Sequence, residues 1–182
     1  SERVLARAFA GRRREVVSAT KFNAVFDEQT REVTGSDSTP AGIRKACEES
    51  LRRLDTDYID LYQFHDNGFP ADKAEPVRET LEGLVADGKI RAYGWSTDFA
   101  DRAEVFAQGK NCASIQLQLN VLDDNAEVIA LCEKYNLAAI NRGPLAMGLL
   151  SGKYTASSKP SVDDVRGEKS PEWMKYFKGG KP

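Results

Sequence analysis

The sequence has 182 residues, 41% of them hydrophobic and 30% charged, and its 26 basic and 28 acidic side chains leave a formal net charge of −2. This balance gives no reason to expect nucleic acid or an anionic membrane surface as a partner. No apolar run approaches the roughly 20 residues that a membrane span needs. Cys47, Cys112 and Cys132 form no C-x-x-C pair, so we expect no disulfide framework, no metal site and a reducing, cytoplasmic location.

Hydrophobic periodicity and turn residues predict helices and strands that alternate along the chain. The predicted helices cover residues 1–10, 40–54, 75–87, 98–108 and 125–135. The predicted strands cover residues 15–21, 57–65, 89–96, 113–119 and 137–142. We expect a polar loop over 22–39, and a long loop over 143–182 with one short helix near 171–177.

This alternation is typical of right-handed βαβ units and therefore of a parallel sheet. A doubly wound open sheet and a (β/α)8 barrel both fit the pattern. No G-x-G-x-x-G string follows a strand, which weakens the dinucleotide-binding open sheet. A complete barrel usually needs about 250 residues, so five strands predict only part of one.

Polar residues stand where the predicted strands end, and sites in parallel α/β folds form at those ends. They are Lys21, His65, Ser96, Gln116 with Asn120, and Arg142. Lys21 could be a solvated strand-end lysine, and His65, the only histidine, could be structural. On adjacent parallel strands, however, both would face one mouth, where a cation could lower the pKa of a neighbouring acid and a histidine could donate a hydrogen bond.

Other polar and aromatic residues have simpler interpretations. Asp57 and Asp60 along one strand are interpreted as pairing partners or loop supports. Tyr93 and Trp95 alternate on one face of their strand and are expected in the core. The basic run 12–14 is expected to be a solvated helix end, with an anion site as the alternative.

Five strings of the sequence carry a more specific signal. They are Ser18–Lys21, Ser50–Tyr62 leading into His65, Leu84–Ser96, Gln116 with Asn120, and Gly143–Tyr154. In collinear order they resemble the aldo-keto reductases, a family of (β/α)8 barrels. The resemblance implies an α/β fold made of a partial barrel of about five parallel strands, without the first two strands and the last one.

The resemblance implies roles for two of the strand-end residues. Lys21 and His65 match two members of the family's catalytic tetrad. In that family a tyrosine protonates the carbonyl oxygen while NADPH delivers hydride to the carbon. The lysine, helped by an aspartate, lowers the pKa of the tyrosine, and the histidine orients the carbonyl. No tyrosine of this sequence stands in the matching position, and the matching aspartate also lies outside it.

The resemblance also implies positions that hold the cofactor NADPH. They are Ser96, Thr97, Gln116, Arg142, Pro144, Leu145, Leu149, Gly152 and Lys153. Ser96 and Gln116 match residues that hold the nicotinamide carboxamide, and 143–154 matches the loop over the pyrophosphate. The sequence departs from the family at Thr97, where asparagine is common, and at Leu119 and Arg142, where aromatic residues are frequent.

These observations predict a barrel core over 1–142, with 143–182 as a cofactor-covering loop and tail of the same domain. The function they imply is NADPH-dependent reduction of an aldehyde or ketone to an alcohol. The alternative is a non-catalytic truncated barrel that acts as a binding or regulatory module. Open barrel edges would expose unpaired backbone groups, so a homo-oligomer formed through those edges is expected.

Overall fold

The structure is a computed structural model that describes residues 1–27, 29–30 and 32–182. The chain divides into two compact units. The first unit comprises residues 1–117 and 125–140, and the second comprises 118–124 and 141–182.

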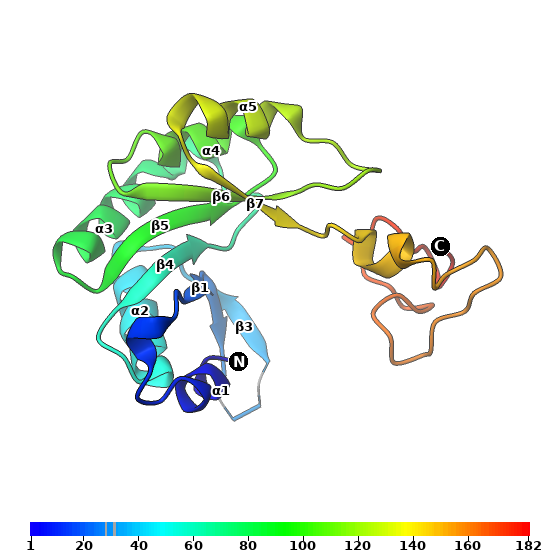
Figure 1. The fold of residues 1–182 in the computed structure, drawn as a ribbon, viewed down its shortest axis with the longest axis horizontal. Coiled ribbons are helices and arrows are strands. Elements are labelled where there is room, and N and C mark those ends of the chain that lie inside the picture. The colour runs from blue at the N-terminus through cyan, green and yellow to red at the C-terminus, as the bar shows by residue number, and fades with distance from the viewer. Residues whose placement is uncertain (28, 31) are drawn as a thin grey trace. The chain divides into compact units, whose positions relative to one another are not determined.

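A parallel sheet with the strand order β1-β4-β5-β6-β7 forms the centre of the fold (Figure 1). Its strands are β1 (Ala19–Phe22), β4 (Ile59–Phe64), β5 (Ile90–Ser96), β6 (Cys112–Gln118) and β7 (Ala138–Arg142). The helices are α1 (Glu2–Ala8), α2 (Pro40–Leu54), α3 (Glu75–Ala86), α4 (Ala100–Ala107) and α5 (Ala126–Tyr135). Short 3-10 helices are η1 (Arg13–Glu15), η2 (Ala71–Lys73) and η3 (Ala146–Ser151). The predicted alternation of helix and strand is confirmed.

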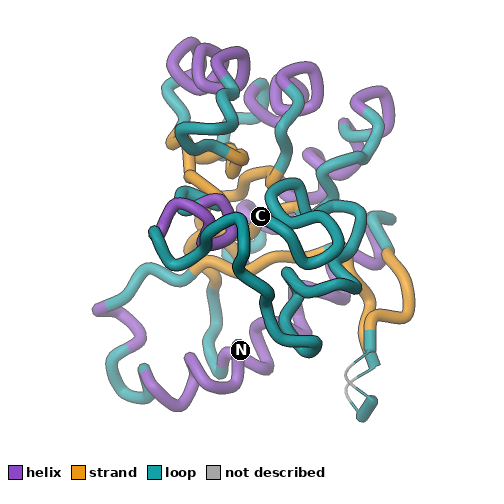
Figure 2. The backbone as a smooth tube through the Cα atoms, turned by 90° about the vertical axis from the view of Figure 1, so that its right-hand side faces the viewer, coloured by secondary structure: helices purple, strands orange, loops and turns teal. Residues whose placement is uncertain are grey.

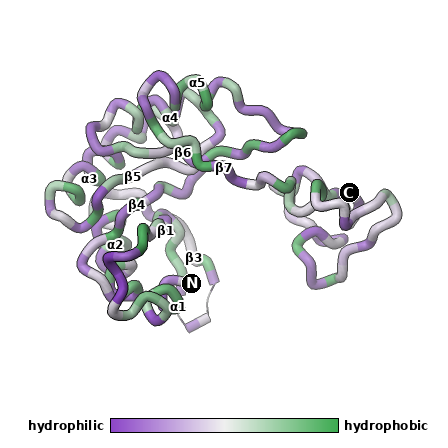
Figure 3. Tube along the Cα trace, viewed as in Figure 1, coloured by the Kyte–Doolittle hydropathy of each residue, from purple (hydrophilic) through white to green (hydrophobic). Residues whose placement is uncertain are grey.

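Helix α2 has the capping residues and the apolar spacing from which its sequence predicted a helix. The Thr39 side chain accepts a hydrogen bond from the backbone N–H of Gly42, and Pro40 occupies the first turn, where its missing N–H costs nothing. Asp55 ends the helix in the left-handed conformation. The buried residues follow helical spacing and are Ile43, Cys47, Ser50, Leu51 and Leu54. In Figure 3 the helices mix hydrophilic and hydrophobic residues, as amphipathic helices do.

The core of the first unit is an aromatic layer between the sheet and the helices. Tyr93 and Trp95 are fully buried, as their alternation along β5 predicted. The Trp95 ring lies 5.2 Å from that of Phe64 on β4 and 4.7 Å from that of Phe106 on α4. Because strand side chains alternate between the two faces, the intervening positions of β4 and β5 point to the opposite side of the sheet.

Two predictions for the N-terminal third were wrong. The strand predicted over 15–21 begins only at Ala19, because the basic residues before it form the turn η1. The polar loop predicted over 22–39 contains the antiparallel hairpin of β2 (Ala24–Phe26) and β3 (Val33–Ser36). Its apolar residues are too few and too exposed to give a clear alternating pattern. Glu28 and Arg31, also in that predicted loop, lie outside the described residues.

The short helix predicted over 171–177 is also wrong. The segment makes one turn, in which the N–H of Met174 donates to the carbonyl of Pro171, and then continues as turns and bends. A seven-residue segment forms too few backbone hydrogen bonds to offset the cost of starting a helix. Figure 2 shows the chain after β7 mostly as loop, with η3 as its helical part.

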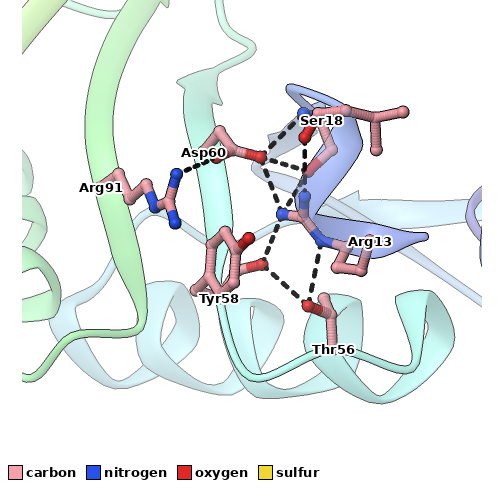
Figure 4. A network of polar contacts seen from close by, with 7 residues as sticks. Arg13, Ser18, Thr56, Tyr58, Asp60 and Arg91 are labelled. Atoms are coloured by element: carbon pink, nitrogen blue, oxygen red, sulfur yellow. Dashed lines mark hydrogen bonds and ion pairs between the residues drawn. The ribbon is translucent and has the colours of Figure 1, made fainter. Parts of the chain in front are cut away.

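A buried carboxylate joins three neighbouring strands at the amino end of the sheet (Figure 4). The side chain of Asp60, on β4, is 7% exposed. Its Oδ2 accepts hydrogen bonds from Arg13 Nη2 at 2.8 Å and from the backbone N–H of Ser18 at 2.9 Å. Its Oδ1 accepts one from Arg91 Nη1, on β5, at 3.0 Å. The prediction that Asp60 is a pairing partner is confirmed.

Two guanidinium groups enclose the ring of Tyr58 beside this carboxylate. The Cζ atoms of Arg13 and Arg91 lie 4.2 and 4.1 Å from the ring centroid. Arg13 also donates to the carbonyl of Tyr58 and to Thr56 Oγ1. Arg13, the middle residue of the basic run, therefore has a structural role. The interpretation of the whole run as a solvated helix end was wrong for this residue.

This network lowers the pKa of Asp60. Burial raises the pKa of the carboxyl group, but hydrogen bonds from the Ser18 N–H and from Arg13, together with the charge of Arg13, outweigh that effect. A carboxyl whose pKa is lower in the folded state than in the unfolded state stabilises the fold above its unfolded pKa of about 3.9. That contribution is lost as the pH falls through the pKa of the folded state.

Replacing Asp60 by Asn is therefore expected to lower the free energy of unfolding at pH 7 by about 2–4 kcal/mol, because it leaves the Arg13 charge without its partner. The difference from the wild type should shrink as the pH falls from about 4 through the lowered pKa of the folded state, where the wild-type carboxyl also becomes protonated. Urea denaturation at pH 7 and at pH 3 measures both effects.

Asp87→Asn is the matched control. Asp87 forms an ion pair with Arg44 at the same 2.8 Å, but the two side chains are 54% and 48% exposed. Exposed pairs contribute little, so this variant is expected to lose less than about 1 kcal/mol. Equal losses in the two variants would contradict the assignment of Asp60 as the buried link between strands.

Candidate functional site

The strand register places the predicted strand-end residues of the first unit on one face of the sheet. Lys21 of β1 pairs with Gln63 of β4, which lies two residues before His65 and on the same face. Ser96 of β5 pairs with Gln116 of β6. Since all four strands are parallel, these residues gather toward the carboxyl end of the sheet.

Direct contacts join three of these residues. The Nζ of Lys21 donates to Gln116 Oε1 at 2.5 Å, and the hydroxyl of Ser96 donates to the same oxygen at 3.4 Å. Lys21 and Gln116 lie on strands separated by two others, which corresponds to about 14 Å along the sheet. Their side chains meet because the sheet curves strongly and this face is its concave side, as in a section of a barrel.

A local irregularity contributes to this curvature. The pairing of β5 with β6 shifts between Tyr93 and Gly94, as in a β-bulge, which bends and twists a strand. At Gly94 the two strands approach so closely that a Cβ atom would lie 2.4 Å from the carbonyl oxygen of Ser114. Only glycine fits at this position.

His65 follows the last residue of β4 and is exposed. Its backbone N–H donates to the carbonyl of Phe22 at 3.1 Å, which extends the pairing of β1 with β4 by one step. Gln63, between His65 and Lys21 on the same face, is 2% exposed. Sequence reasoning overlooked Gln63, although a polar residue on the same strand face as Ile59 and Leu61 was a usable signal.

Thr97 lies just beyond β5 and is fully buried. Its hydroxyl donates to the backbone carbonyl of Asn67 at 3.2 Å and accepts from the N–H of Phe99 at 3.4 Å. The hydroxyl is therefore engaged with the loop that follows His65, in contrast to the hydroxyl of Ser96, which points to Gln116.

The second unit holds the remaining predicted residues. Asn120 Nδ2 donates to the carbonyl of Gly143 at 3.1 Å, and the N–H of Leu119 donates to the carbonyl of Arg142 at 3.2 Å. Arg142 is half-buried. The end of β7 and the segment after β6 are thus linked within this unit.

The loop after β7 has a compact, turn-rich backbone. Ala146, Met147 and Gly148 have φ angles of 48°, 55° and 96°, so three successive residues lie in the left-handed region. Gly152 has a φ of 75° and ends η3. The predicted cofactor-binding residues of this loop are exposed, apart from the half-buried Leu149; they are Pro144, Leu145, Gly152 and Lys153.

A polar cleft of about 370 Å³ adjoins this loop within the second unit. Its lining includes Lys153 and Lys159 with the hydroxyl-bearing residues Ser158 and Ser161. Ammonium and hydroxyl groups are donors that suit phosphate oxygens. Asp164, also in the lining, forms a bidentate pair with Arg166, and its hydrogen bonds with Arg166 lower the pKa of the carboxyl to about 2.

One organising residue of the second unit gave no sequence signal. The hydroxyl of Tyr176 accepts hydrogen bonds from Gln118 Nε2 at 2.9 Å and Asn120 Nδ2 at 2.7 Å, and it donates to Asp123 Oδ2 at 3.1 Å. A phenol has one proton to donate and two lone pairs, so these contacts use its full capacity. Tyr176 thereby ties the tail to the segment after β6, more than 50 residues earlier.

Tyr176→Phe is expected to loosen this connection, because it removes the hydroxyl that joins Gln118 and Asn120 to Asp123, at a cost of about 1–3 kcal/mol. Backbone amides in 118–124 and 171–178 should then exchange with solvent about tenfold faster or more, as measured by hydrogen–deuterium exchange with mass spectrometry.

Tyr154→Phe provides the comparison. Tyr154 packs its ring edge-on against the buried Phe177, with the centroids 5.0 Å apart, and the substitution keeps that ring. Exchange in both segments should stay close to that of the wild type. The same acceleration in both variants would show that the Tyr176 hydroxyl is not what holds the tail.

The comparisons with known proteins agree with this geometry. The aldo/keto reductase family model matches residues 1–178. Aldo-keto reductase YhdN of Bacillus subtilis is 33% identical in an alignment of 179 positions that covers 91% of this chain and 50% of that protein. The glycerol dehydrogenase AKR11B4 from Gluconobacter oxydans is 33% identical with a TM-score of 0.78, over 96% of this chain and 54% of that one.

A third comparison is with a cofactor complex. The aldo-keto reductase from Klebsiella pneumoniae, solved with NADPH, is 31% identical with a TM-score of 0.62, over 81% of this chain and 49% of that one. The chain spans about half the length of the curated relatives it matches.

The fold is therefore α/β, with a five-stranded parallel sheet that forms part of a (β/α)8 barrel. The chain belongs to the aldo/keto reductase family. No helix in the described part of the chain is long and apolar enough to cross a membrane. Among the same residues, no group of three or more His, Cys, Asp or Glu side chains is placed to hold a metal ion.

Proposed function

We propose that this chain is part of an NADPH-dependent oxidoreductase that reduces an aldehyde or ketone to an alcohol. The observation that carries the proposal is the contact of Lys21 with Gln116, with Ser96 beside it, on the concave face of the sheet. Three polar groups from three strands converge there, at the end of a parallel sheet where barrel enzymes have their sites.

Lys21 and His65 are the proposed catalytic residues of this chain. A lysine cation close to a phenol favours the phenolate and so lowers the pKa of the phenol. An imidazole N–H can donate a hydrogen bond to a carbonyl oxygen and fix its orientation. The proton-donating tyrosine and the aspartate of the family have no counterpart among the residues of this sequence.

The residues of the concave face fit a nicotinamide. Its carboxamide offers one acceptor oxygen and two N–H donors, and Gln116 with Ser96 provides complementary amide and hydroxyl groups 3.4 Å apart. Bound NADPH would supply the hydride, while the protein orients the ring and excludes competing reactions. By the family resemblance, Arg142 belongs to the proposed cofactor set, whereas the hydroxyl of Thr97, the other position that the resemblance implies, donates to the backbone carbonyl of Asn67.

The loop after β7 is proposed to cover the cofactor's phosphates. Pro144, Leu145, Leu149 and Gly152 would shape it, and Lys153 would contact phosphate as a point charge. Lys153 lines the polar cleft together with Lys159, which supports a preference for an anion.

Lys153→Ala is expected to weaken NADPH binding about tenfold, because it removes one charge-assisted phosphate contact. Titration of the chain with NADPH, followed by cofactor fluorescence, measures the dissociation constant. Lys169→Ala removes another exposed lysine of the second unit, outside the cleft, and should leave that constant unchanged. If the wild-type chain shows no saturable binding, the proposal that these residues form a cofactor site is wrong.

Lys21→Met is expected to reduce carbonyl turnover about a hundredfold or more, since it removes the cation that favours the phenolate. The assay follows NADPH consumption with a panel of small aldehydes and ketones, using the chain and any longer polypeptide that contains it. Lys45→Met, on the outer helix α2, is the control and should keep wild-type turnover. Saturable NADPH binding without turnover in every form would favour the binding-module alternative.

A further inference from the structure

The turn after His65 is held from the end of β5. The indole N–H of Trp95 donates to the backbone carbonyl of Asp66 at 2.8 Å. Two residues later, the Thr97 hydroxyl donates to the next backbone carbonyl, that of Asn67, at 3.2 Å. Trp95 and Thr97 are both fully buried, so these donors are fixed by the core.

Three further hydrogen bonds lock the same turn. Arg102 Nη1 donates to the carbonyl of Asn67 at 2.8 Å, and the N–H of Asp98 donates to Asn67 Oδ1 at 2.7 Å. Within the turn, the N–H of Gly68 donates to Asp66 Oδ1 at 3.1 Å. The carbonyl of Asn67 thus accepts two hydrogen bonds, which is its full capacity.

His65 itself depends on this turn because it lies between a paired strand and the anchored peptides. Its N–H is fixed by the carbonyl of Phe22, and the two residues after it are fixed by Trp95 and Thr97. Its imidazole is exposed, so burial in the core does not hold it in place. The backbone on either side of His65 therefore sets the position from which the imidazole extends.

We propose that Thr97 is a positioning residue for His65, acting through the carbonyl of Asn67, and that it does not contact the cofactor. The proposal rests on the proposed function insofar as His65 is catalytic. It also explains what the threonine that departs from the family pattern does in this chain. The only hydroxyl proton of Thr97 is directed to the turn and away from the concave face, where Ser96 and Gln116 meet.

Thr97→Val tests this, because valine keeps the branched shape and removes the hydroxyl. His65 is the only histidine of the chain, so its imidazole proton resonances are assigned without ambiguity. We expect these resonances to shift in Thr97→Val and to stay at their wild-type positions in Thr97→Ser, which restores the donor. The NADPH dissociation constant should change by less than about twofold.

Thr80→Val is the matched control. The hydroxyl of Thr80 is also buried and also donates to a backbone carbonyl, that of Pro76 at 2.8 Å, but within helix α3. It should leave the His65 resonances unchanged. Arg102→Gln is a second variant at a half-buried position, and it should shift the same resonances in a chain whose core is intact.

The outcomes separate the possible roles of Thr97. Unchanged His65 resonances in both Thr97→Val and Arg102→Gln would overturn the proposal. Weakening of NADPH binding by about tenfold in Thr97→Val would also overturn it and would show a cofactor contact. If the wild-type chain does not bind NADPH at all, the proposed function fails, while the resonances still decide whether Thr97 positions His65.

Discussion

The register of β4 against its two neighbours is the constraint on which the first unit depends. Asp60 fixes it at one end by accepting hydrogen bonds from Ser18, just before β1, and from Arg91 on β5. A shift of one residue would turn every side chain of β4 to the other face, which would bury His65 among the aromatic residues and expose Phe64. The buried carboxylate therefore sets, from one end of the sheet, which residues can reach the concave face at the other. The hydrogen-bond network that stabilises the sheet therefore lies at the amino end of these strands, and the candidate site lies at their carboxyl end, as in other parallel barrels.

Much of this arrangement followed from the sequence. The alternating helices and strands, the inner face of α2 and the core positions of Tyr93 and Trp95 depend on local periodicity, which a sequence displays directly. That Lys21 and Gln116 lie toward one edge of the sheet followed from a general rule, that parallel strands share a carboxyl edge, but their direct contact did not. The specific roles within that edge came from resemblance to a family and from nothing that composition or spacing could provide.

Two of the features that escaped prediction involve partners distant in sequence, and a third is a short exposed hairpin. Arg13 looked like one of three surface arginines, and only folding brings it to Asp60 and Tyr58. Tyr176 gave no signal because its three partners lie more than 50 residues away. The hairpin in 22–39 is short and exposed, so its strands show no alternation of apolar and polar residues from which they could be predicted. For Arg13 and Tyr176, contacts with remote segments decide the role of the side chain, and local propensity does not reveal such contacts.

Trp95 and Thr97 show how one strand can serve both faces of the site. Ser96, between them, points to the concave face and meets Gln116, while its two neighbours point away and hold the turn that carries His65. Period-two alternation puts Trp95 and Ser96 on opposite faces of β5, and the hydrogen bond of the Thr97 hydroxyl to the carbonyl of Asn67 directs it to the same turn as Trp95. The end of β5 therefore couples the group that would face the cofactor to the backbone that positions the histidine. A change in the sheet at this point would disturb both, which is a physical reason for the core around Trp95 to be as densely aromatic as it is.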